Sequence, residues 1–229
     1  TPVFEGFSDK TVDFMWGIRF NNEKTWFEAH KEEYLTYFYN PMRELGRQVF
    51  DGMTERHGDL GLVLKVSRIY RDARRLHGRG PYKDHLWLPM ERPGGEEWTG
   101  RPVFWFELAP ESWSYGLGYW CAGALTMAKF RARLDRDPKT FEKLVRAFNK
   151  QEEFVLEGEE YKRPKGQTTP LLTPWYNRKG LVLSRECPNG GVLFTPELPQ
   201  VLVDGYSFLL PYYRYFLSLE GDPDPRDGQ

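Results

Sequence analysis

Long apolar runs are missing from this chain of 229 residues. A transmembrane helix needs about 20 consecutive apolar residues, and the apolar runs here are far shorter. The sequence also opens without a charged segment followed by an apolar stretch and a small-residue cleavage site, which are the features of a secretory leader. We therefore expect a cytoplasmic protein with no membrane partner.

Cysteine is scarce, since Cys121 and Cys187 are the two in the chain. Two cysteines exclude a disulfide framework, although a single bond between them stays open. Four histidines are present, at His30, His57, His77 and His85. Their spacing matches no metal-binding signature, and no nucleophile elbow, phosphate-binding glycine loop or dinucleotide fingerprint occurs. We expect no bound metal and no cofactor.

An excess of charge of either sign is missing too. The 32 basic and 33 acidic residues give a formal net charge of −1. This near-neutral balance argues against a bulk electrostatic partner such as duplex DNA or an acidic membrane face. It leaves room for a local patch that holds a few phosphates, and it says nothing about protein partners.

Helical and strand-like segments are grouped along the chain. Helices are expected in the segments 9–18, 24–30, 41–57, 124–134, 138–148 and 196–219, the last one interrupted at Gly205 and Pro211. Strands are expected in the segments 62–70, 85–90, 103–108, 113–120, 181–183 and 191–194. Residues 109–112 form a short connection between two of these strands, which predicts an antiparallel hairpin.

This grouping, without βαβ alternation, predicts the α+β fold class. We expect a single domain over residues 1–220, with a central, mostly antiparallel sheet flanked by N-terminal, middle and C-terminal helices. Residues 221–229 are acidic and rich in proline and glycine. Because they have no apolar face to bury, they predict a flexible tail.

What the chain does have is one strongly basic segment, from Lys65 to His85. Seven cations and two anions give this segment a local charge of +5. The cations are Lys65, Arg68, Arg71, Arg74, Arg75, Arg79 and Lys83, and the anions are Asp72 and Asp84. Cations gathered so densely repel one another, so a folded protein tolerates them best with an anion among them. The segment therefore predicts an anion site.

Alternation along the expected strand at 62–70 separates these side chains. Lys65 and Arg71 share one face, whereas Arg68 lies in an apolar row on the other. An arginine in an apolar row needs a partner, which is Asp72, Glu107 or a ligand. Two interpretations stay open: an internal salt-bridge framework that holds the loop on the sheet, or a cradle in which the planar guanidinium fork binds an oxyanion.

The basic segment also resembles the hallmark of a known family, which has the form K-V-x-R-I-x-R-D-x-R-F followed after a short gap by P-Y-K. Here the pattern reads Lys65-Val66, Arg68-Ile69, Arg71-Asp72 and Arg74, and then Pro81-Tyr82-Lys83. Flanking likenesses occur at residues 4–7, 21–27, 116–120 and 162–166. From about Phe4 to Leu219, the chain resembles the conserved hypothetical family catalogued as domain of unknown function 2461.

Two departures from this pattern make the segment more basic. Arg75 stands where the hallmark has phenylalanine, and residues 76–80 replace a gap rich in serine, lysine and aspartate. The resemblance implies a soluble α+β domain with no established reaction, cofactor or substrate. It also suggests that Lys165 and Lys179, from other loops, join the basic cluster.

The favoured hypothesis is a domain that binds a small phosphorylated or carboxylated anion. The expected ligand-binding residues are Lys65, Arg68, Arg71, Arg74, Tyr82, Lys83 and Trp105. Tyr82, Trp105 and Trp120 would offer stacking faces.

Two alternatives accompany this hypothesis. In the first, an enzyme acts on a phosphate-bearing substrate, with the cluster stabilising charge and Glu107 or Asp72 as the catalytic base. A role for Glu107 as counter-ion to Arg68 or Arg71 competes with that assignment. In the second, the cluster is an internal framework in a protein–protein interaction module.

Overall fold

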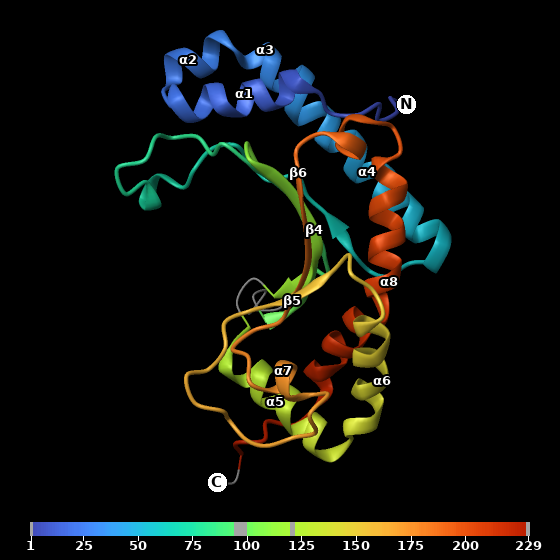
Figure 1. The fold of residues 1–229 in the computed structure, drawn as a ribbon. Helices are drawn as coiled ribbons and strands as arrows, with labels where there is room; N and C mark the ends of the chain where they lie inside the picture. The colour runs from blue at the N-terminus through green and yellow to red at the C-terminus, as the bar shows by residue number, and fades with distance from the viewer. Residues whose placement is uncertain (1, 94–99, 120–121, 228–229) are drawn as a thin grey trace. The chain divides into compact units, whose positions relative to one another are not determined.

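The computed structural model (Figure 1) describes residues 2–93, 100–119 and 122–227 and has an α+β fold. The six strands formed by these residues make one antiparallel sheet in the order β1-β2-β3-β4-β6-β5. The strands are β1 (Val63–Leu64), β2 (Leu86–Glu91), β3 (Pro102–Leu108), β4 (Ser112–Tyr119), β5 (Val155–Glu157) and β6 (Val182–Pro188). The predicted fold class is confirmed. The expected hairpin is present as well, because β3 and β4 are neighbours and the Ala109 N–H donates to Ser112 O at 3.0 Å.

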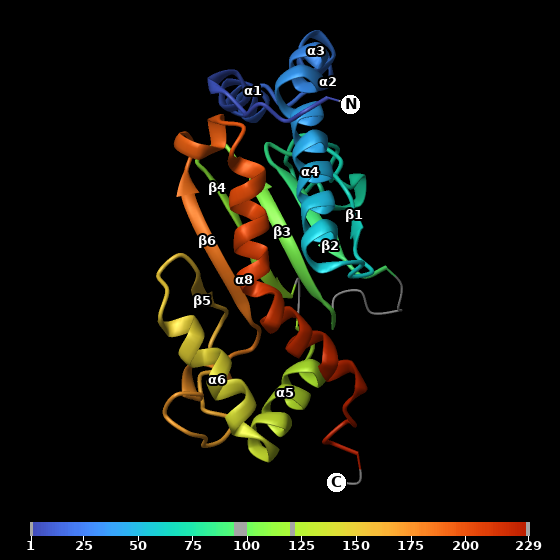
Figure 2. The same cartoon turned by 90° about the vertical axis from the view of Figure 1, so that its right-hand side faces the viewer.

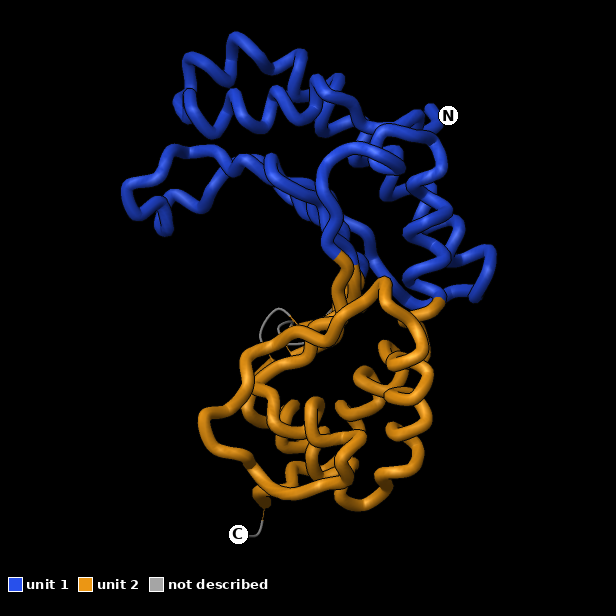
Figure 3. Tube along the Cα trace, in the orientation of Figure 1, with its two compact units in different colours: residues 1–90, 105–115, 186–207 blue, residues 91–104, 116–185, 208–229 orange. Residues whose placement is uncertain are grey.

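The chain divides into two compact units, which Figure 3 colours separately. Unit 1 consists of residues 1–90, 105–115 and 186–207, and unit 2 consists of residues 91–104, 116–185 and 208–229. The strands β2, β3, β4 and β6 contribute residues to both units, and so does the helix α8 (Leu198–Ser218). The whole basic segment belongs to unit 1.

Unit 1 begins with helices whose ends follow from their capping residues. α1 (Asp9–Phe20) starts after Ser8, whose N–H donates to Thr11 Oγ1 at 3.1 Å. It is followed by α2 (Lys24–Ala29), α3 (Lys31–Glu33), the π-helical η1 (Tyr34–Tyr39) and α4 (Asn40–His57). α4 has Pro41 in its first turn and ends at Gly58, whose φ of 79° favours glycine. The three helices expected here are therefore confirmed, whereas the π-helical turn was not predicted.

In unit 1, α4 and the first part of α8 cover one face of the sheet (Figure 2). The Tyr206 hydroxyl on α8 donates to the backbone oxygen of Trp105 at 2.6 Å. On α4, a Cβ at Gly46 would lie 2.9 Å from Leu88 Cδ1, so glycine permits the close approach of helix and sheet. The opposite face of β2 and β3 carries Trp87, Trp105 and Glu107, which are half-buried.

The strand expected at 62–70 is wrong in its extent, because regular pairing stops after Leu64. The Ser67 N–H still donates to Trp87 O at 3.0 Å, but the Trp87 N–H donates to the Ser67 hydroxyl at 2.8 Å. A side-chain oxygen therefore takes the place of the backbone carbonyl, and the regular ladder is interrupted. The segment remains extended as far as an antiparallel bridge between Tyr70 and Tyr82.

Two expectations for the C-terminal part are also corrected. Residues 191–194 form a 3₁₀ helix rather than a strand, because Gly190 and Gly191 have positive φ values of 123° and 56°. α8 is continuous through Gly205 and Pro211. Side chains next to Pro211, among them Leu209 and Leu210, are buried. The free energy of this burial offsets the loss of the backbone hydrogen bond that proline cannot donate.

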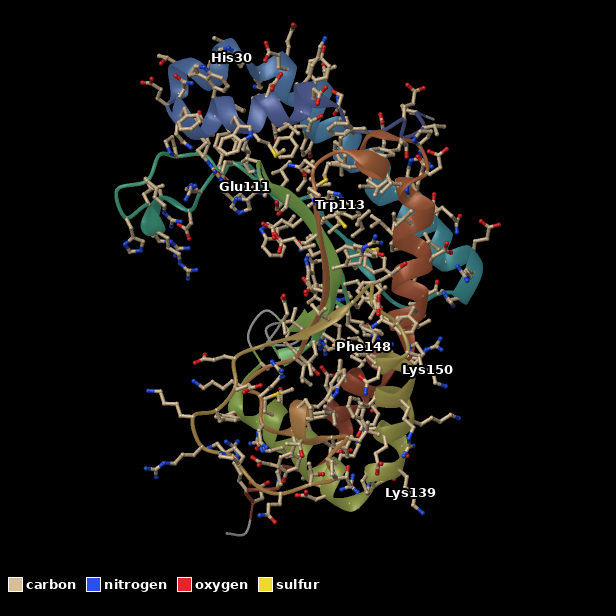
Figure 4. All side chains as sticks on the ribbon, in the orientation of Figure 1. His30, Glu111, Trp113, Lys139, Phe148 and Lys150 are labelled. Atoms are coloured by element: carbon tan, nitrogen blue, oxygen red, sulfur yellow. The ribbon has the colours of Figure 1, made fainter. Side chains whose placement is uncertain are left out.

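Unit 2 is built from α5 (Ala124–Arg136), α6 (Pro138–Asn149), α7 (Thr173–Tyr176) and the antiparallel pair β5–β6. Asp137 caps α6, because its side chain accepts the Thr140 N–H at 3.4 Å. Figure 4 shows Lys139 and Lys150 near the two ends of α6 and Phe148 near its C-terminal end. Phe148 packs edge-on against Trp175, with the ring centroids 5.3 Å apart.

The segment 221–229, expected to be a flexible tail, is anchored near its start, because Asp222 Oδ1 lies 2.6 Å from Arg133 Nη2 in unit 2. Within the described ranges, no helix combines the length and apolar character needed to cross a membrane.

Candidate functional site

The basic segment is fixed to the helices of unit 1 by Asn22. Its side-chain amide donates to Tyr82 O at 2.8 Å and accepts the Tyr82 N–H at 2.9 Å. Gly80 permits this contact, because a Cβ there would lie 2.2 Å from Asn22 Oδ1. The Tyr82 ring stacks on Phe27 with a centroid distance of 4.5 Å. The backbone that precedes Lys83 is therefore held at a defined position.

Tyr82 serves this attachment rather than ligand stacking. Tyr82 is 3% exposed, so the expectation that it offers a stacking face is corrected. Trp105, by contrast, is half-buried on the outer face of β3. Trp120, the third expected stacking residue, lies outside the described residues.

Arg71 and Lys83 lie together at the end of this anchored segment. The Arg71 N–H donates to Pro81 O and its Nε donates to Tyr82 O, both at 2.8 Å. Burial lowers the pKa of Arg71, and the nearby Arg79 lowers it further, while Asp84 opposes the change. Burial also lowers the pKa of Lys83, and Arg71 adds to that effect. Among the described residues, the Lys83 ammonium makes no hydrogen bond or ion pair.

The other cations of the segment face solvent. Lys65, Arg68, Arg75 and Arg79 are exposed. Arg68 does not lie in an apolar row, because the strand alternation used to place it ends at Leu64. The side chain of Arg79 closes the loop by donating to Leu76 O and Arg75 O at 3.2 and 3.0 Å.

Asp72 and Arg74 form a local ion pair at the surface. Arg74 Nε and Nη2 donate to the two oxygens of Asp72 at 3.1 and 3.0 Å. These bonds, together with one from the Arg74 N–H, lower the pKa of Asp72. A carboxyl group held in its ionised form in this way is a weak base at neutral pH, which counts against Asp72 as the catalytic base.

Asp84 is the centre of a second, less exposed network. Its Oδ2 lies 2.6 Å from Arg19 Nε, and its Oδ1 lies 2.8 Å from His85 Nδ1. Arg19 also pairs with Glu111, which Figure 4 shows at the β3–β4 turn near α1. Burial opposes ionisation of Asp84, but the hydrogen bonds from His85 and Arg19 lower its pKa overall. Asp84 is therefore a carboxylate that orients the imidazole of His85.

Glu107 lies close to this network on the outer face of the sheet. Burial raises the pKa of Glu107, and the carboxylates of Glu186 and Asp84 raise it further, although His85 opposes them. Glu186 accepts a hydrogen bond from the Ser112 hydroxyl at 2.9 Å. Among the described residues, Glu107 forms no ion pair with Arg68 or Arg71, so the expected counter-ion role is not what its surroundings provide.

Lys165 and Lys179 belong to unit 2 and have local partners there. The Lys179 ammonium lies 2.8 Å from Glu159 Oε1, and the Lys165 ammonium lies over the Tyr161 ring, 4.8 Å from its centroid. In the described part of the chain, no group of three or more His, Cys, Asp or Glu side chains is arranged to hold a metal ion. A cavity of about 570 Å³ in unit 1 is lined by Tyr39, Arg43, Arg47, Leu64 and Val66, among others, and by none of the cations at 68–83.

The network around Asp84 was missed by the sequence reasoning. Asp84 was counted only as a charge, His85 was weighed only as a metal ligand, and Arg19, Glu111 and Glu186 were not singled out. Adjacent aspartate and histidine immediately after Pro-Tyr-Lys was the available signal.

The sequence model of the conserved hypothetical protein family DUF2461 matches residues 10–215. The chain belongs to this family. The match includes every candidate residue from Arg19 to Glu186, so the site of this DUF2461 member lies within the family's shared region. A search of curated proteins found no match to the chain.

Proposed function

We propose that unit 1 binds a small phosphorylated or carboxylated anion through Arg71 and Lys83, with Lys65, Arg68 and Arg74 around them. The observation that carries this proposal is the pair Arg71–Lys83, two neighbouring cations that are partly removed from water. Each of the two groups has a lowered pKa, and Lys83 has no acidic partner among the described residues. An anion between them replaces repulsion by attraction.

The chemistry of the two side chains favours a phosphate monoester or a carboxylate. Arg71 uses Nε to bond Tyr82 O, which orients the guanidinium and leaves its Nη atoms for a ligand. Arginine matches two anionic oxygens at once, and lysine adds a compact charge with three donors. The exposed cations at Lys65 and Arg68 add a longer-range attraction that weakens with salt.

An internal framework explains only part of the cluster. Arg19–Asp84 is a pair of that kind, because it ties the segment to α1, whereas Arg74–Asp72 is a local pair at the surface. Arg71 and Lys83 belong to neither pair. This favours anion binding over an internal framework as the role of these two residues.

The proposal is tested by titrating the protein with inorganic phosphate in a calorimeter at two salt concentrations. Charge-assisted hydrogen bonds contribute about 1.5–3 kcal/mol, so Arg71→Ala or Lys83→Ala should weaken phosphate binding by about tenfold or more. Arg75→Ala, which removes an exposed cation from the same segment, is the matched control. Unchanged phosphate affinity in both Arg71→Ala and Lys83→Ala would overturn the proposal.

A further inference from the structure

His85 has the arrangement of a proton acceptor. Its Nδ1 is hydrogen-bonded to Asp84, and Asp84 is held in turn by Arg19. When the Asp84 carboxylate accepts the Nδ1–H, the lone pair of the imidazole is at Nε2. The side chain of His85 is 29% exposed, and its Nε2 has no hydrogen-bond partner among the described residues. Nε2 is therefore available to a bound molecule.

Glu107 has the opposite character. Two other carboxylates, Glu186 and Asp84, lie within electrostatic reach of it, and its own side chain is half-buried. These surroundings favour the protonated form of Glu107. An imidazole held by a carboxylate, beside a carboxyl group that can hold a proton, provides a base and an acid for one site.

His85 follows Lys83 by two residues, and Glu107 lies within electrostatic reach of Asp84, the residue between them. Lys83 precedes Asp84 directly, and the charge of Asp84 is felt by both Arg71 and Glu107. We infer that His85 and Glu107 are the base and the acid of a phosphomonoester hydrolase whose phosphate group is held by Arg71 and Lys83. This inference rests on the proposed anion site and extends it to a reaction.

The reaction consumes one water molecule. His85 Nε2 removes a proton from water as the water oxygen forms its bond to phosphorus. The bond between phosphorus and the ester oxygen breaks, and Glu107 gives its proton to the departing oxygen. The products are an alcohol and inorganic phosphate, and the proton on His85 then returns to Glu107. Arg71 and Lys83 stabilise the charge on the phosphoryl oxygens throughout.

The test measures phosphate release from two probes, 4-nitrophenyl phosphate and phenyl phosphate. General acid–base groups contribute about 10²–10⁴-fold, so His85→Asn should lower kcat at least about 100-fold for both. Asparagine keeps an N–H near the position of Nδ1 for Asp84 while removing Nε2. His77→Asn is the matched control, because His77 is exposed, has a φ of 48° that asparagine tolerates, and should leave kcat unchanged.

Glu107→Gln separates the roles of acid and base. Phenolate needs a proton on departure much more than nitrophenolate does, so this variant should lose more activity on phenyl phosphate than on 4-nitrophenyl phosphate. Equal losses on both probes would overturn the assignment of Glu107 as the acid. Circular dichroism and the melting midpoint of each variant show whether a loss of activity is a loss of fold.

Phosphate titration in the calorimeter separates this inference from the proposed function. If the wild-type protein binds phosphate but hydrolyses neither probe, the acid–base inference is overturned and the anion site stands. If it does not bind phosphate, both are overturned. Retention of kcat by a folded His85→Asn protein would also sink the inference. Phosphate affinity that is unchanged in His85→Asn while kcat falls supports it.

Discussion

Arg71 Nε and the backbone oxygen of Tyr82 lie 2.8 Å apart, and the same oxygen accepts a hydrogen bond from Asn22 at 2.8 Å. One carbonyl group therefore joins a cation of the proposed anion site to the helical part of unit 1. The next residue is Lys83, so both cations are positioned by the same short piece of backbone. This arrangement makes stability and anion binding separable by mutation.

Lys83→Met should stabilise the protein while it removes phosphate binding. The lowered pKa of Lys83 means that folding disfavours its charged form, and methionine fills a similar volume without that charge. We expect the melting midpoint to rise by roughly 2–4 °C, which corresponds to about 1 kcal/mol in a domain of this size. Phosphate should no longer raise the midpoint. A lower midpoint in Lys83→Met would contradict this account.

The pH dependence of stability tests whether the charge of Lys83 destabilises the folded protein. Its pKa in the folded state is below the unfolded value, so the charged form costs stability at neutral pH. The free energy of unfolding of the wild type should therefore rise relative to that of Lys83→Met as the pH increases. This rise should begin at the lowered folded pKa and end near about 10.4, the unperturbed lysine pKa. Urea unfolding of both proteins at a series of pH values from 7 upward measures this difference.

Asn22→Ala should weaken both the fold and the anion site. The variant loses two hydrogen bonds to the backbone of Tyr82, at about 1 kcal/mol each, so we expect a loss of about 2 kcal/mol in urea unfolding. Phosphate affinity should fall by about tenfold, because Arg71 and Lys83 lose their fixed positions. Asn21→Ala is the control, since the Asn21 side chain donates to Gly17 O of α1 and, among the described residues, makes no hydrogen bond to the basic segment. Full phosphate affinity in Asn22→Ala would show that the attachment does not position the cations.

Local patterns were sufficient to predict the parts of this fold that depend on neighbouring residues. The helices expected to start at residues 9, 41 and 138 start within one residue of those positions, next to Ser8, Pro41 and Asp137-Pro138. Each of these features is decided within a few residues. The charge count picked out the basic segment, and its role in anion binding stays a prediction.

The charge count treated the seven cations as equal, whereas in the structure they differ in burial and in their partners. Which cation is paired depends on contacts between distant residues: Arg19 reaches Asp84 across 65 positions of the chain, and Asn22 reaches Tyr82 across 60. Tyr82 was assigned to the ligand because its burial against Phe27 has no local signature. The pattern around Ser67 likewise depends on Trp87, 20 residues away.

Asp84→Asn should destabilise the protein in a way that depends on pH. Hydrogen bonds from His85 and Arg19 lower the pKa of Asp84 in the folded state, so its contribution is present above the unfolded carboxyl pKa of about 3.9. It is lost as the pH falls through the folded value. At pH 7 we expect a cost of about 2 kcal/mol, on the scale of hydrogen bonds to charged groups. Urea unfolding at pH 7 and at successively lower pH should show the two proteins converging.

Asp72→Asn is the control for that experiment. Asp72 also has a lowered pKa, but its pair with Arg74 is exposed to solvent, and exposed pairs contribute little. Its removal should leave urea unfolding unchanged within error. A difference between wild type and Asp84→Asn that stays constant down to acid pH would show that the carboxylate charge is not what stabilises the network.

Gly205→Ala should destabilise the protein although alanine is the better helix former. In a solvent-exposed helix the change would gain about 1 kcal/mol. In α8, however, the new Cβ would lie 2.4 Å from Tyr115 Oη and 2.5 Å from Tyr115 Cε2, and both residues are buried. Overpacking of a buried site costs about 1–3 kcal/mol, so we expect a net loss in urea unfolding. Because Tyr115→Leu removes the overlapping atoms, Gly205→Ala should cost less on that background. A Gly205→Ala protein more stable than wild type would mean that α8 moves away from β4 at little cost.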